Sequence, residues 1–202
     1  MKRWSAILLI TGGLTWGLKA FYDWIVLDRL IHYGYDAAIT DYIFAFVPLL
    51  IAVGTIGCLS IYRGEVAAYG RKGLGTAAAG SFLLSISFIA AAWFPGTGIG
   101  YFSLLGGPGF ILVFIGFLLF GLAAVRSRGR SSIIGWASLG VSLLTIAWPL
   151  VTAIPYHIDR SMAGQLIAAK YGFPVSVLQG FALAVFGVLT AVQLRQTLKL
   201  SP

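Results

Sequence analysis

Long apolar runs recur along this sequence, and each is about as long as a membrane's hydrocarbon core is thick. A helix that rises about 1.5 Å per residue needs about 20 mostly apolar residues to cross that core. Six such runs occur, at residues 4–27, 42–62, 73–94, 108–125, 132–154 and 174–194. Because lipid offers no hydrogen-bond partner to an unpaired backbone amide, each run is expected to be helical. The sequence therefore predicts an all-α, polytopic integral membrane bundle of six transmembrane helices.

The composition supports a membrane protein with no separate soluble domain. Of the 202 residues, 59% are hydrophobic and only 10% are charged, whereas soluble domains average about 25% charged residues. The segments between the apolar runs are short. We therefore expect one six-helix transmembrane domain over residues 1–202.

Basic residues mark one side of the predicted bundle. Ten of the 14 Lys and Arg residues lie before the first run, between the second and third, between the fourth and fifth, or after the sixth. Cytoplasmic loops of membrane proteins are enriched in Lys and Arg. Both termini are therefore predicted to be cytoplasmic, with the chain in a cell membrane. The net charge of +8 then reflects topology and contact with anionic membrane lipids, and no nucleic-acid partner is expected.

An offset of sixty residues relates the third run to the fifth. The stretch 75–95 matches 135–155 at Gly75 and Gly135, at Gly80 and Gly140, and at further small and aliphatic positions. This similarity predicts a tandem hairpin repeat in which spans 2–3 and 4–5 are duplicates, as in some transporters. Chance similarity between two helices rich in Gly, Ala and Leu is the alternative, and it stays open.

Small residues four apart predict close helix packing at three places. Such pairs let a neighbouring helix approach closely in a membrane. The pairs are Gly13 with Gly17, Gly54 with Cys58, and Ala77 with Ser81. Cys58 is the only cysteine, so an internal disulfide or a Cys-based zinc site is excluded.

Two charged residues lie within or at the end of the first run. Lys19 and Asp23 are four residues apart and so share one helix face, where they can pair. An ionisable residue at membrane depth is by default a candidate functional residue. The alternative is that Lys19 extends outward to Asp23 and the headgroups, as long basic side chains near helix ends do. The second interpretation is preferred.

Further ionisable residues are expected in loops on the outer side and complete a candidate polar cluster with Lys19 and Asp23. The first outer loop is predicted to carry Asp28, His32 and Asp36, and the last to carry His157, Asp159 and Arg160. Two His and several carboxylates could converge on a metal. No HExxH motif supports a metal, so a solvated polar rim is the preferred interpretation. No metal or cofactor is expected.

The outer segment 95–109 is rich in glycine and is a second candidate functional element. It resembles a phosphate-binding loop only superficially, because no strand precedes it and no Lys-Ser or Lys-Thr pair follows. Its middle could lie at the interface or re-enter the protein.

Three functional hypotheses remain. The first is a non-enzymatic accessory or scaffold subunit of a larger membrane complex, which would bind partner subunits or copies of itself. The second is a small-solute or ion transporter or channel that uses Lys19 and Asp23. The third is a lipid- or quinone-handling enzyme with a site at the outer face, formed by His32, His157 and Asp159. The lack of a catalytic motif favours the first.

Overall fold

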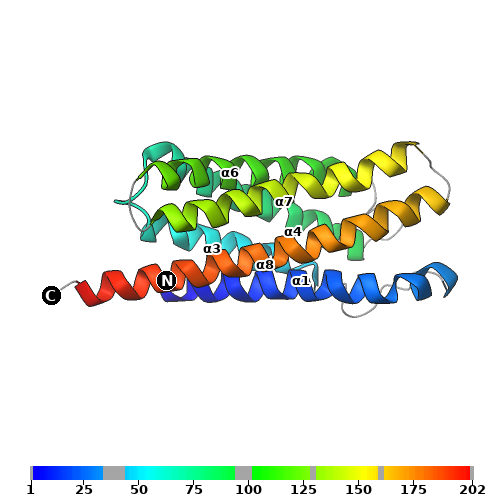
Figure 1. Cartoon of the computed structure of the whole chain (residues 1–202), viewed down its shortest axis with the longest axis horizontal. Helices are drawn as coiled ribbons and strands as arrows, with labels where there is room; N and C mark the ends of the chain where they lie inside the picture. Colours follow the sequence, from blue (N-terminus) through cyan, green and yellow to red (C-terminus); the bar gives the residue numbers. More distant parts are fainter. Residues whose placement is uncertain (1, 34–43, 94–101, 128–130, 159–161, 201–202) are drawn as a thin grey trace.

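The computed structural model of the chain is a bundle of long helices that lie side by side (Figure 1). It describes residues 2–33, 44–93, 102–127, 131–158 and 162–200, with side-chain surroundings over 4–25, 44–93, 104–127, 131–152 and 170–196. The helices are α1 (Lys2–Tyr33), α3 (Val47–Ile61), α4 (Ala68–Trp93), α6 (Gly107–Arg126), α7 (Ser131–Ile158) and α8 (Met162–Leu200). A π-helical turn, η1 (Phe102–Gly106), leads into α6. These residues include no strand, so the all-α prediction is confirmed for the described chain.

Several of these helices have the length and composition of membrane spans. Among the residues whose surroundings the structure describes, four stretches are long and apolar enough to cross a membrane: Ala68–Trp93, Leu104–Arg126, Ser131–Thr152 and Lys170–Gln196. Helix α3 is apolar but has 15 residues, which at about 1.5 Å per residue is shorter than a core about 30 Å thick. The bundle is therefore consistent with a membrane-embedded protein. That all six helices cross stays a prediction.

Helix α3 begins later than the apolar pattern predicts. The run was expected from residue 42, but the helix starts at Val47, with Pro48 in its first turn. Proline suits this position because its missing N–H would have no helical partner there. Hydropathy predicts where the chain is apolar, but it does not predict the residue at which this helix begins.

The six helices form a closed ring, in which each packs against its neighbours in sequence and α1 packs against α8. Figure 1 shows α1 and α8 side by side, with the start of α1 and the end of α8 toward the same end of the bundle. Helices α1 and α8 are therefore antiparallel. This places the two ends of the described chain on one side of the ring, as the prediction of a shared side for both termini requires.

Glycines bring the helix backbones into contact around the ring. A Cβ on Gly13 of α1 would lie 2.5 Å from the backbone nitrogen of Ala184 in α8. A Cβ on Gly80 of α4 would lie 2.7 Å from the carbonyl oxygen of Gly109 in α6. Real Cβ atoms are not found so close to backbone atoms, so these helices could not approach as they do with any larger residue. The predicted close packing at Gly13 is confirmed.

Large aromatic side chains fill the middle of the ring toward the end where α3 meets α4. Tyr62, Phe117, Phe120 and Phe186 are all fully buried. The ring centroids of Tyr62 and Phe120 are 5.2 Å apart, and those of Phe120 and Phe186 are 5.8 Å apart. These residues come from the end of α3 and from α6 and α8, which are not neighbours along the chain. The side chains therefore meet across the ring and pack its interior at this level.

The sixty-residue similarity has mixed support from the structure. Ser85 of α4 and Thr145 of α7, which correspond at the sixty-residue offset, are both buried. The matched glycines differ, because Gly80 and Gly135 each contact α6 whereas a Cβ on Gly75 or Gly140 would meet no atom within 4 Å. Each matched glycine pair thus joins one packed position with one open position. The hairpin repeat stays a prediction.

Candidate functional site

Lys19 and Asp23 form an ion pair on the inward face of α1. The Nζ atom of Lys19 lies 2.5 Å from Oδ1 and 2.6 Å from Oδ2 of Asp23. Their side chains are only 10% and 16% exposed. Trp16 and Ala20, on the same side of the helix, are buried in the bundle. The protein itself therefore shields most of this pair from its surroundings.

An aromatic ring lies near the ammonium end of the pair. Lys19 Nζ lies 5.7 Å from the centre of the Phe44 ring, a distance at which the ring face attracts a cation. Phe44 in turn packs on Trp16 and Phe88, with ring centroids 5.1 Å and 5.8 Å away. The indole nitrogen of Trp16 is buried and has no hydrogen-bond partner. A charged pair and an unpaired donor thus lie beside one aromatic cluster.

The structure agrees only in part with the interpretation that Lys19 extends outward to Asp23 and the headgroups. Its ammonium does turn toward Asp23, one helical turn further along α1. It does so, however, on a face covered by the bundle, where ionisable residues of membrane proteins usually pair. This geometry suits either a structural or a functional pair.

The other residues of the predicted outer cluster are placed differently from the expectation or lie outside the described chain. Asp28 and His32 belong to α1, and His157 belongs to α7, so the prediction that these three lie in loops is wrong. The helices extend past their apolar parts, since a polar helix end can be solvated by headgroups and water. The side chains of these three residues are outside the described surroundings, and Asp36, Asp159 and Arg160 are outside the described residues altogether. Their convergence stays a prediction.

The glycine-rich outer segment is described only in its second half. Phe102–Gly106 is a single π-helical turn that continues directly into α6. The residues before it, 94–101, lie outside the described chain. Whether the segment re-enters the protein stays open, but its second half is helical.

A second polar cluster, which the sequence analysis missed, joins the end of α3 to α8. The Tyr62 hydroxyl donates to Oγ1 of Thr190 at 3.0 Å. The Gln193 amide donates to Oε2 of Glu65 at 2.8 Å. The signal was available in part: Thr190 and Gln193 are three residues apart in α8, which puts them on one helical face. Nothing in the sequence indicated that this face opposes Tyr62 and Glu65, which follow the end of α3.

Serine, threonine and glutamine side chains link neighbouring helices elsewhere. Ser138 of α7 donates to the carbonyl oxygen of Phe117 in α6 at 2.7 Å. The Gln179 amide of α8 donates to Thr145 of α7 at 3.0 Å. These hydrogen bonds act as packing contacts between helices.

Comparison with known proteins identifies no relative. No family model matches the sequence, no curated protein matches it, and no solved structure matches it. The fold therefore defines only a general class, a helical bundle of membrane type with its ring closed by the first and last described helices. Any function has to be argued from the geometry of the chain itself.

Proposed function

We propose that this protein is a non-enzymatic subunit of a larger membrane assembly, either with partner subunits or with copies of itself. One observation carries the proposal: Gly75 in α4 and Gly140 in α7 have open space where a side chain would be. Both lie well inside their helices. Each is a place where a helix from another subunit could approach closely.

The energetic argument compares these glycines with the others in the bundle. Glycine inside a helix is less favourable than alanine by about 0.5–1 kcal/mol. At Gly13 and Gly80 a close helix contact within the ring offsets that penalty. At Gly75 and Gly140 no contact within the described chain offsets the penalty. A partner helix at these positions would supply the missing contact.

The packed interior favours the same proposal over a channel. Phe117, Phe120 and Phe186 are fully buried and contact one another across the ring. A pore through the bundle at this level would require these aromatic side chains to move apart. An assembly role requires no such path.

Site-specific photo-crosslinking tests the proposal. Cys58, the only cysteine, is first replaced by Ala, and single cysteines are introduced at exposed positions one turn from each glycine, as Ala79→Cys and Leu143→Cys, or, as a matched control, as Val185→Cys. Val185 is exposed on α8. After labelling with a photoreactive maleimide in native membranes, the first two variants should give products well above the monomer mass of 21.6 kDa. The control should stay monomeric. Equal crosslinking at all three positions, or none at 79 and 143, would contradict the proposal.

A specific observation also favours transport as a second candidate function. The Lys19–Asp23 pair is covered by the bundle, and Trp16, whose buried indole N–H has no hydrogen-bond partner, precedes Lys19 by three residues on α1. Paired ionisable residues inside a membrane bundle often mark solute or ion pathways. A substrate could displace Asp23 from Lys19 and occupy this position.

Flux in reconstituted vesicles tests the second candidate. Lys19→Ala and Asp23→Ala should each abolish uptake. Arg126 is a basic residue exposed at the end of α6, and Arg126→Ala should leave uptake unchanged. Folding of each variant is checked by its elution from a sizing column. Unchanged flux in both pair variants would remove Lys19 and Asp23 from any transport mechanism.

A further inference from the structure

A pocket opens where α3 ends and α4 begins, at the end of the bundle that holds the start of α1. It has a volume of about 760 Å³ and is lined by Leu59, Ser60, Arg63, Ala68, Arg71 and Lys72. Three of these six residues are basic and none is acidic. Arg63 in the connection between α3 and α4, and Arg71 and Lys72 in the first turns of α4, thus place three cations around one hollow.

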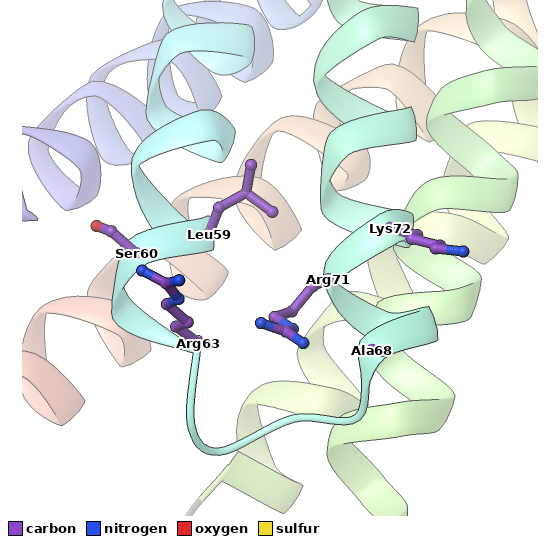
Figure 2. Close-up of a pocket in the computed structure, with 6 residues that line it drawn as sticks. All are labelled: Leu59, Ser60, Arg63, Ala68, Arg71 and Lys72. Carbon is purple, nitrogen blue, oxygen red and sulfur yellow. The ribbon is translucent and has the colours of Figure 1, made fainter.

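Arg71 is the residue that distinguishes this pocket from an ordinary basic loop. Figure 2 shows its side chain projecting from α4 into the space between α3 and α4. Arg71 is half-buried, and its Nε atom is buried without a hydrogen-bond partner. Buried polar atoms are nearly always paired, so the unpaired N–H leaves the Arg71 guanidinium with hydrogen-bonding capacity that the described chain does not use.

Topology alone does not explain this arrangement. The enrichment of cytoplasmic loops in basic residues requires only that Lys and Arg lie on that side of the membrane, and it does not require them to line a pocket. It would be served equally by exposed side chains, such as those of Arg63 and Lys72. A charge partly withdrawn from water next to like charges is unfavourable unless an anion joins it.

We propose that this pocket binds the phosphate of an anionic phospholipid headgroup. A planar guanidinium presents a fork of N–H donors that matches phosphate oxygens. Basic pockets between membrane helices on the cytoplasmic side are suited to such headgroups. Leu59 gives the pocket an apolar wall beside its basic residues, as expected where a headgroup meets its acyl chains. A lipid is therefore favoured over free phosphate as the source of the anion.

Binding by the purified full chain in neutral detergent tests the proposal. Native mass spectrometry would follow retention of three probes: dioleoylphosphatidylglycerol, dioleoylphosphatidylcholine and inorganic phosphate. We expect phosphatidylglycerol to be retained in preference to the other two. Arg71→Gln should weaken its apparent affinity about tenfold, equivalent to about 1.4 kcal/mol.

Matched variants separate a built site from general attraction of a basic surface. Arg126→Gln removes the same charge at an exposed position that does not line the pocket, and its effect should be below about twofold. Arg63→Gln, at an exposed pocket position, should weaken binding by about fivefold, the loss of roughly one surface cation, and carries little risk to the fold. Equal losses from Arg126→Gln and Arg71→Gln would overturn the site. Inorganic phosphate bound as tightly as phosphatidylglycerol would overturn the lipid assignment.

Discussion

The hydroxyl of Tyr62 donates a hydrogen bond of 3.0 Å to Thr190, and so ties the end of α3 to α8 across the ring. Thr190 in turn donates to the carbonyl oxygen of Phe186 at 2.9 Å, one turn earlier in its own helix. Tyr62 and Thr190 are both fully buried. Since α3 and α8 are not neighbours along the chain, this bond fixes the ring's interior in a way that contacts between successive helices do not.

Replacing Tyr62 by Phe should lower the free energy of unfolding by about 1 kcal/mol, since it removes one buried hydrogen bond and keeps the ring. Thr190→Val should also destabilise the bundle, and the double variant should lose less than the sum of the two. Tyr69→Phe, at an exposed tyrosine, is the control. Unfolding in a denaturing detergent measures all four. Strictly additive losses would show that the two hydroxyls do not interact.

Gly116 and Gly75 should respond in opposite ways to added side chains. A Cβ on Gly116 would overlap the backbone nitrogen of Ala77 in α4, so Gly116→Ala should force α4 and α6 apart and destabilise the fold by about 1–3 kcal/mol. Gly75→Ala meets open space and should stabilise the isolated chain by up to about 1 kcal/mol. Thermal unfolding of the purified variants makes the comparison. Tolerance of Gly116→Ala would contradict the close approach of α4 and α6.

Removing one member of the Lys19–Asp23 pair should cost more than removing both. Asp23→Leu leaves the shielded Lys19 ammonium without its carboxylate. The free energy of unfolding should fall by about 3 kcal/mol, the lower end of the range for breaking a buried ion pair, because both side chains keep some exposure. Lys19→Met with Asp23→Leu should recover most of that loss. The readout is the free energy of unfolding. A double variant no more stable than Asp23→Leu alone would mean that the pair's contacts, and not its charges, matter.

Cys58 should be inert to thiol reagents while the bundle is folded. Its side chain is fully buried, whereas Ser60, two residues along the same helix, is exposed. N-ethylmaleimide should therefore label Ser60→Cys, in a Cys58→Ala background, within minutes and leave the native Cys58 unlabelled until a denaturant is added. Mass spectrometry counts the adducts. Rapid labelling of Cys58 in the folded protein would contradict the packing of α3.

Reporter fusions at the two ends of the chain should report from the same compartment. The start of α1 and the end of α8 lie toward one end of the bundle (Figure 1), and the distribution of basic residues predicts that this end is cytoplasmic. A fluorescent protein that matures only in the cytoplasm should therefore be bright at either terminus. Signals from opposite sides of the membrane would refute the topology.

The sequence allowed the helices to be predicted because membrane length and backbone pairing leave so few alternatives. The run at 108–125 corresponds closely to α6, which is Gly107–Arg126. Helix ends were less predictable. Asp28 and His32 were expected in a loop because hydropathy falls there, yet a helix can continue through polar residues once water or headgroups solvate it.

The pairing of Lys19 with Asp23 was predictable from spacing alone, because four residues on one helix bring two side chains together. The links from Tyr62 to Thr190 and from Gln193 to Glu65 were not, since each joins residues 128 positions apart. Contacts of that kind depend on how the helices are ordered in space. The pocket around Arg71 was missed for the same reason. In addition, the enrichment of cytoplasmic loops in Lys and Arg already explained the basic residues that line it.

The contact between α1 and α8 has a consequence for how the protein is made. When α1 leaves the ribosome its glycine face, at Gly13 and Gly17, has no partner, because the glycine-containing surface of α8 that fits against it is synthesised long afterwards. Until then the five earlier helices form an arc with two uncovered edges. Closing that arc is a late step in biogenesis, and a nascent chain halted before α8 would display those edges to the insertion and quality-control machinery.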